Sequence, residues 1–250
     1  DPAPLLARVD QRRGPTGELP VVMTLSGPDG SSRTFTERLR LPLPDTAATV
    51  FEPPRHWARA ADRVTVRGRT LPDSAVRVGQ IGTRADAEGA FTLVVPLGPP
   101  GSQTLSLVVD APQRRPSTLL VAVERLDADG EARARAALAA QALAIGAPRG
   151  PTRYTHLLGD PPRAAGAIVR LAGKVVGARR AEAGGGDVLQ IAACTHGDGC
   201  PAWIETTGAV MVEAGDAVTV VGRADGAHTY RTRGGEPVTA PRLTGAVVLP

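Results

Sequence analysis

The chain has 250 residues, of which 42% are hydrophobic, 22% are charged and only 3% are aromatic. This length allows one or two domains with real cores, and no apolar run approaches the ~20 residues that a membrane-spanning helix needs. The net charge is only +4 and Lys174 is the sole lysine, so the arginine-rich composition looks more like coding bias than a nucleic-acid footprint.

Glycine and proline, with 29 and 23 residues, make up roughly a fifth of the chain, against ~12% in average proteins. This balance favours short strands joined by many turns. The chain starts at Asp1 without an initiator methionine, which resembles a mature or trimmed end.

Residues 1–52 contain the signal of a β-hairpin. An apolar run at 21–25 is followed by a Gly-Pro-Asp-Gly turn at 27–30 and by alternating residues at 34–43. Two strands joined by that turn are the simplest interpretation. Because an isolated hairpin is only marginally stable in water, we expect residues 1–52 to pack on the domain that follows.

Residues 53–127 carry short runs that alternate between apolar and polar side chains. Turn-forming clusters separate these runs, as a small antiparallel sandwich requires. The pattern consists of Val64, Val66 and Gly68, then Pro72, Ala75 and Val76, then Asp86, Gly89 and Phe91, and finally Leu97 and Gly101. Over about 55–125 this pattern resembles the bacterial immunoglobulin-like modules of secreted and surface proteins. The segment 23–43 repeats it faintly, with Asp29 and Gly30 before Phe35.

Residues 128–152 read as a helical linker. The segment 129–146 is rich in alanine and places Leu138, Ala142 and Ile145 at helical spacing, and prolines at 148 and 151 then break the chain. We therefore expect a helix that connects two separate cores, with few contacts crossing between them.

Residues 153–250 carry a second all-β pattern. A short helical turn near Tyr154 leads into strand candidates at 168–176, 188–194, 202–205, 216–223 and 242–249. Glycines at 173, 215 and 222 fit the bends of a closed five-stranded barrel. The order of these features resembles the OB-fold barrels of exported bacterial proteins. The predicted fold is therefore mainly β: an N-terminal immunoglobulin-like β-sandwich, a connecting α-helix and a C-terminal OB-like five-stranded β-barrel.

Cys194 and Cys200 are the only cysteines and flank a short Gly-Asp-Gly loop. In an exported protein such a pair would be oxidised, so we predict a disulfide. The alternatives are free thiols, or a metal site made of Cys194, His196 and Cys200 with Asp198. Structural zinc usually has four ligands, and no second ligand pair occurs nearby.

Trp203 and Tyr230, with Arg179 and Arg180, are the candidate surface-binding residues. OB-folds bind single-stranded nucleic acids by stacking bases on aromatic rings above a basic groove. Arginine is spread evenly through this chain and is matched by acids, and aromatic residues are sparse. We therefore expect Trp203 in or beside the core and the arginines on a solvated surface.

No catalytic motif is recognisable in the sequence. The four histidines, at 56, 156, 196 and 228, lie far apart, and neither a Gly-x-Ser-x-Gly elbow nor a His-Glu-x-x-His helix occurs. The expectation is a non-enzyme without a cofactor or a metal.

The leading hypothesis is an extracytoplasmic structural or adaptor protein of a bacterial cell-envelope or surface assembly. It would be periplasmic, outer-membrane-associated or secreted, and would act through contacts with other envelope or surface proteins. The alternatives are binding of single-stranded nucleic acid or another polyanion through the barrel, which the sparse aromatic residues and the evenly spread charges argue against, and a carbohydrate-binding accessory module. Such fold analogy does not itself establish function.

Overall fold

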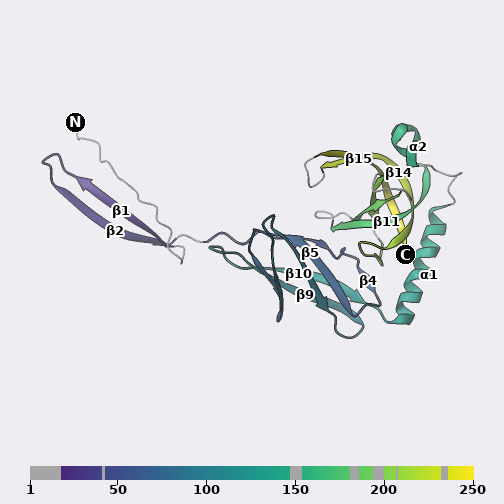
Figure 1. The fold of residues 1–250 in the computed structure, drawn as a ribbon, viewed down its shortest axis with the longest axis horizontal. Coiled ribbons are helices and arrows are strands. Elements are labelled where there is room, and N and C mark those ends of the chain that lie inside the picture. The colour runs from purple at the N-terminus through teal and green to yellow at the C-terminus, as the bar shows by residue number, and fades with distance from the viewer. Residues whose placement is uncertain are drawn as a thin grey trace.

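The computed structural model describes residues 18–40, 43–146, 154–180, 186–193, 200–206, 208–231 and 236–250. Over these residues the chain is mainly β and is organised as a separate hairpin, two sheets that share a core, and a closed barrel (Figure 1). The prediction of a mainly β protein is confirmed.

The N-terminal hairpin consists of β1 (Glu18–Ser26) and β2 (Ser32–Arg40), which pair antiparallel with Met23 opposite Phe35. These strands pair only with each other and lie at one end of the molecule, away from the other sheets (Figure 1). We expected residues 1–52 to pack on the sandwich. Among the described residues of this region, the two hairpin strands lie apart from the sandwich and the segment that follows the hairpin joins it. There, Thr46 is fixed by backbone and side-chain hydrogen bonds to the carbonyl of Arg115, both at 2.9 Å.

Two sheets pack against each other after this segment. One has the order β3-β5-β8 and the other the order β4-β10-β9-β6-β7. The strands are β3 (Thr49–Glu52), β4 (Ala58–Arg59), β5 (Arg63–Arg69), β6 (Ala75–Val78), β7 (Ile81–Arg84), β8 (Ala90–Pro96), β9 (Gly101–Asp110) and β10 (Ser117–Arg125).

The alternating pattern of these strands builds the core between the two sheets. Every second side chain of β5, β8, β9 and β10 points inward, and Val66, Leu107 and Val121 are fully buried. Gly68 lies opposite Phe91 in the β5–β8 register, and a Cβ atom at this position would come within 2.5 Å of the Phe91 ring. The glycine therefore makes room for the aromatic ring at the centre of the sheet.

The C-terminal part is a closed barrel with the strand order β11-β12-β13-β15-β14. Its strands are β11 (Ile168–Arg180), β12 (Asp187–Ala192), β13 (Pro201–Thr206), β14 (Ala217–Arg231) and β15 (Pro237–Leu249). Val169, Leu189, Ile204, Val220 and Leu243 fill its interior and are fully buried. The short helices α2 (Tyr154–Gly159) and α3 (Pro161–Ala164) precede the barrel in the chain.

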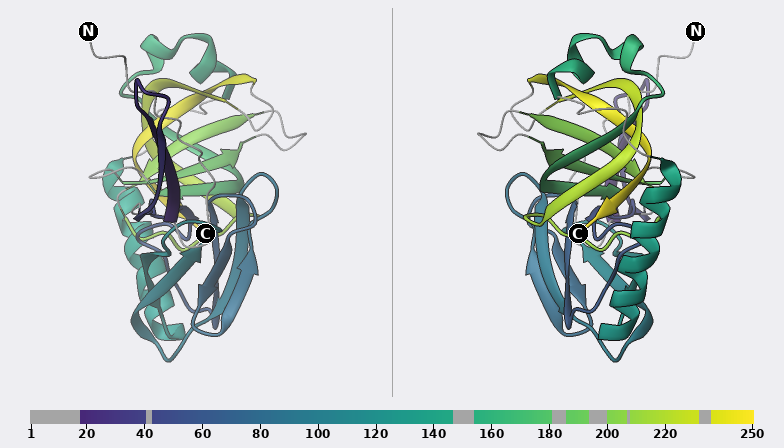
Figure 2. Two further views of the ribbon diagram at one scale, coloured as in Figure 1. Left: turned by 90° about the vertical axis from the view of Figure 1, so that its left-hand side faces the viewer. Right: turned by 90° about the vertical axis from the view of Figure 1, so that its right-hand side faces the viewer.

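The predicted linker helix is α1 (Ala128–Ile145), which begins at its N-cap Asp127 and ends at Gly146 with φ 112°. It is more than a connector. Leu138 and Ala142 pack against Val221 and Val247 of the barrel. Figure 2 shows α1 along the side of the molecule, from the sheets of the sandwich to the barrel.

Candidate functional site

An aromatic cluster lies on the outer side of the barrel. Trp203 of β13 stacks on His228 of β14 with ring centroids 4.0 Å apart, and Tyr230 lies 5.7 Å from Trp203. His228 and Tyr230 are two residues apart in one strand, so both side chains point to the same face of the β14–β15 hairpin. That face covers Trp203, which is only 9% exposed.

The tyrosine hydroxyls near this cluster have partners within the chain. Gln190 Nε2 donates a hydrogen bond to the Tyr230 hydroxyl, and the Tyr154 hydroxyl donates to the Pro201 carbonyl at 2.6 Å. Burial raises the pKa of both tyrosines, and the charge of ionised Tyr230 raises the pKa of Tyr154 further. The rings and hydroxyls are therefore engaged in internal packing, as expected for Trp203 from the sequence.

Arg179 and Arg180, the two arginines predicted to bind at the surface, have different environments. Arg179 is exposed and its guanidinium lies 6.0 Å from the centre of the Phe51 ring. Arg180 is half-buried and donates from Nε to the Pro53 carbonyl at 2.7 Å. Successive residues of a strand face opposite sides, so this pair does not form one basic surface. Burial also lowers the pKa of Arg180.

The sandwich and the barrel meet at a junction built on Asp187, the first residue of β12. This carboxylate is fully buried and accepts three hydrogen bonds: from the backbone N–H of Arg55 at 2.7 Å, from the backbone N–H of His56 at 2.9 Å, and from His56 Nδ1 at 3.0 Å. Because backbone donors already use both of its oxygens, Asp187 fixes this segment whatever the charge of the imidazole. The sequence contained no local signal for this contact, since Arg55 and His56 are 132 and 131 residues from Asp187.

Trp57 adds a buried side chain to the junction, and the backbone around it pairs with the barrel. Its side chain is 1% exposed, and the residue forms a parallel bridge with Val210. Val210 donates to the His56 carbonyl at 2.8 Å, and its own carbonyl accepts from Ala58 at 3.2 Å. The Trp57 indole N–H donates to Glu213 at 3.3 Å. A short stretch of the sandwich is therefore hydrogen-bonded to the barrel as a strand would be.

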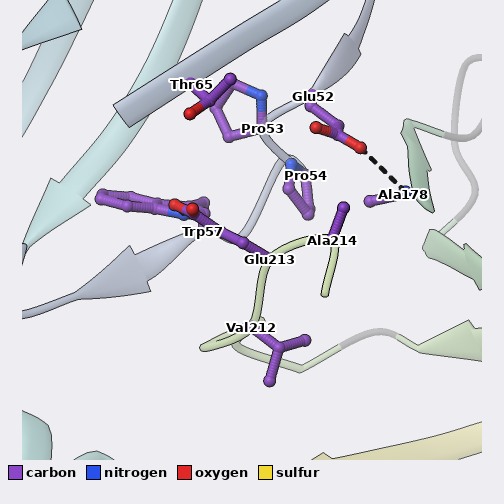
Figure 3. A pocket seen from close by; sticks show the side chains of 9 residues that line it. All are labelled: Glu52, Pro53, Pro54, Trp57, Thr65, Ala178, Val212, Glu213 and Ala214. Carbon is purple, nitrogen blue, oxygen red and sulfur yellow. Dashed lines mark hydrogen bonds between the residues drawn. The ribbon is translucent and has the colours of Figure 1, made fainter. Parts of the chain in front are cut away.

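Charged groups surround this contact. Arg59 lies 3.0 Å from Asp216 and 3.9 Å from Glu213, and Glu52 accepts a hydrogen bond from the backbone of Ala178 at 3.4 Å. A pocket opens between these groups, with Trp57, Glu213 and Glu52 among its lining residues (Figure 3). Its volume is ≈ 240 Å³ even when space open to solvent is counted, below the ~300 Å³ of the smallest typical ligand sites. The junction is better suited to hold two domains in place than to bind a small molecule.

The predicted disulfide lies at the edge of the described residues. Cys194, His196 and Asp198 are outside them, so both the disulfide and the metal alternative stay predictions. The backbone N–H of Ala193 donates to the Cys200 carbonyl at 2.8 Å, which brings the two ends of this loop together. Within the described ranges, no cluster of three His, Cys, Asp or Glu side chains could hold a metal ion.

Comparison with known proteins adds little to this geometry. No protein-family model matches the chain, and no curated protein matches it. One solved structure from an Antarctic bacterium, described as "Ca2+-stabilized adhesin helps an Antarctic bacterium reach out and bind ice", has 11% sequence identity and a TM-score of 0.22. The match covers 91% of this chain and 56% of that one, so the chain spans little more than half of it. Of the helices in the described ranges, none has the length and apolar character needed to cross a membrane.

Proposed function

We propose that this chain is a non-catalytic extracytoplasmic adaptor of a bacterial cell-envelope or surface assembly, and that it acts through protein–protein contacts. In this proposal residues 53–127 form an immunoglobulin-like sandwich and residues 153–250 an OB-like barrel. The two facing sheets with a shared core support the first assignment. The five-stranded closure with β15 between β13 and β14 supports the second.

The observation that carries the proposal is the hairpin β1–β2. It projects from the rest of the molecule, and it exposes large apolar side chains: Leu25 is 41% exposed and Phe35 is 45% exposed. Leu25, Met23 and Phe35 share one face, since Met23 lies opposite Phe35 and Leu25 lies two residues further along β1. An exposed apolar face on a projecting element is typical of a protein contact site.

The rim of this face is charged. Arg33 and Glu37 flank Phe35 at spacings of two residues, and both are exposed. An apolar centre with a polar rim is the usual composition of a protein–protein interface. The hairpin therefore has the features of an arm that docks into a second protein.

The rest of the molecule provides a platform for this arm. The Asp187 and Trp57 contacts fix the sandwich on the barrel, and the bonds of Thr46 to Arg115 fix the end of the segment that carries the hairpin. A fixed platform with a projecting apolar element suits an adaptor better than it suits a protein that closes on a ligand.

The test is site-specific photo-crosslinking in the source organism with a photoreactive amino acid at position 35. We expect crosslinks to one extracytoplasmic protein, and we expect Leu25→Ser to abolish them because it removes apolar area from the same face. The matched control places the photoreactive residue at position 120, where Leu120 is 68% exposed on β10. Equal crosslinking from position 120, or a cytoplasmic location of the chain, would overturn the proposal.

A further inference from the structure

Strand β8 forms the edge of its sheet, and β7 of the facing sheet lies close to it without pairing. It pairs with β5 over its whole length from Ala90 to Pro96, and no other described strand pairs with it. Only its first residue has a further backbone partner, because the Ala90 carbonyl accepts a hydrogen bond from Asp86. On its outward face Thr92 is exposed and Val94 is 47% exposed.

The other strand edges of the described chain are protected against pairing. β7 has only 4 residues and carries Arg84, while β4 has 2 residues. β3 lies against β11 and accepts a hydrogen bond from it through Glu52. In the hairpin, β2 has four charged residues among its nine, and β1 contains Pro20.

β8 differs from all of these edges because its seven residues, AFTLVVP, include no charge. Natural proteins usually protect an open edge with charged residues, with proline within the strand or with short length. Here the only proline, Pro96, is the last residue. A long uncharged edge of this kind is a site for adding a further strand.

We propose that β8 pairs antiparallel with β8 of a second copy of this chain, about a two-fold axis at Leu93. In this register Thr92 lies opposite the partner's Val94, so both exposed Val94 side chains gain a neighbour on the outer face. The inward residues Phe91 and Val95 meet across the new pair and stay on the core side. The register therefore pairs inward residues with inward residues and outward residues with outward residues, and it brings no charges together within β8.

The neighbouring charges do not oppose this arrangement. The outward residues of β5 include Arg63, Arg67 and Arg69. In the dimer the two β5 strands would be three strand spacings apart, ~14 Å, which exceeds the ~8 Å Debye length at physiological salt. The β5 arginines of the two copies would therefore be largely screened from one another.

The size of the contact sets the expected strength. A single pair of edge strands falls in the class of small interfaces, below ~1,200 Å², that form weak and transient complexes. We expect sedimentation velocity of the full chain to show a monomer at about 1 μM and mostly dimer at about 500 μM. Hydrogen exchange at the higher concentration should be slowed in β8 and unchanged in β7.

A charge-swap pair tests the register. Thr92→Lys combined with Val94→Lys places like charges directly opposite each other twice, and we expect at least a roughly tenfold weaker dimer. Thr92→Glu combined with Val94→Lys places opposite charges there, and we expect dimerisation to return to the original level or above. Both positions point outward, so the fold should be kept, which circular dichroism would verify.

Two further variants separate this surface from others. Leu120→Lys changes charge at an exposed site of the other sheet and should leave the dimer unchanged. Phe35→Asp disrupts the hairpin face, so loss of the dimer in this variant would assign self-association to the hairpin and overturn the proposal. Three other results would also overturn the proposal. The chain could stay monomeric at about 500 μM, the dimer could survive in the double lysine variant, or the charge swap could fail to restore dimerisation.

Discussion

Asp187 shows how much a single side chain contributes to the arrangement of this molecule. It is fully buried, and its carboxylate satisfies the backbone of a segment that belongs to the other domain. Each oxygen of this buried carboxyl group has a hydrogen-bond donor, which offsets the cost of removing the group from water.

The first prediction concerns this residue. Asp187→Asn leaves one acceptor oxygen where three donors converge, and we expect the free energy of unfolding to fall by about 2–3 kcal/mol. Chemical denaturation would measure this change. The matched control is Asp225→Asn. Asp225 is half exposed and forms an ion pair with Arg242 at 3.5 Å, and exposed ion pairs contribute little to stability. This substitution should therefore lower the free energy of unfolding by less than about 0.5 kcal/mol. Equal effects of the two substitutions would contradict the role given to the junction.

The second prediction concerns the only two tyrosines, Tyr154 and Tyr230. Burial raises the pKa of each above its ordinary value of 10.0, so the folded chain holds these protons more tightly than the unfolded chain. The resulting stability is complete below pH ~10 and is lost as the pH rises through the folded-state pKa values. Tyrosinate absorbance should therefore develop at higher pH in the folded chain than in denaturant. Tyr230→Phe should lower the pKa of Tyr154, because it removes the second charge.

At the scale of elements, β12 and β13 are connected by the segment that carries both cysteines. The Ala193–Cys200 backbone bond closes the base of the loop. This bond holds Ala193, the neighbour of Cys194 in the chain, against Cys200, which is consistent with the predicted disulfide.

The third prediction is that Cys194 and Cys200 are disulfide-bonded. Intact mass spectrometry under non-reducing conditions should give a mass two hydrogens below that of the dithiol. Cys194→Ser with Cys200→Ser should lower the free energy of unfolding by about 2 kcal/mol, from the entropy of closing so short a loop. Stoichiometric zinc with both thiols reduced would contradict this and support the metal alternative.

The fourth prediction concerns the aromatic cluster. Because His228 and Tyr230 cover Trp203, few ring faces are left for stacking bases. Binding of a single-stranded oligonucleotide should therefore be weak, wholly electrostatic, and absent at ~0.15 M salt. Fluorescence anisotropy would measure it. Micromolar binding at this salt concentration that Trp203→Ala removes would support the polyanion-binding alternative.

At the scale of the whole molecule, the junction holds the sandwich and the barrel together. We expected few contacts across the helical linker, but Asp187, Trp57 and Arg59 connect the sandwich and the barrel directly. The two cores stay distinct, yet the contact between them is continuous along a short segment.

The fifth prediction follows from this contact. Trypsin should cleave the arginine-containing break at 147–153, and the two halves should still elute together under native conditions, because the junction does not depend on that peptide bond. Asp187→Asn should make them separate more readily. Separation of the original halves without denaturant would contradict the prediction.

The sequence predicted what short-range patterns encode and missed what distant residues create. Alternation predicted β5, β8 and β10, and the alanine-rich run with its terminal glycine predicted α1, because both signals are local. The grouping of Arg179 with Arg180 failed since neighbours in a strand face opposite sides. The hydrogen bonds between Asp187 and His56 could not be predicted, because they depend on how the two domains pack against each other.

The two tryptophans lie in two different regions: Trp57 belongs to the core of the sandwich at the junction, and Trp203 lies on the outer side of the barrel beside Tyr230. Because they are the only tryptophans, Trp203→Phe or Trp57→Phe leaves a single emitter that reports on one of the two regions. Both tyrosines also lie in the C-terminal part, and Tyr230 is 5.7 Å from Trp203, so light absorbed by Tyr230 is transferred efficiently to the barrel indole. The choice of excitation wavelength, together with one tryptophan substitution, therefore separates the fluorescence of the junction from that of the barrel. No attached dye is needed.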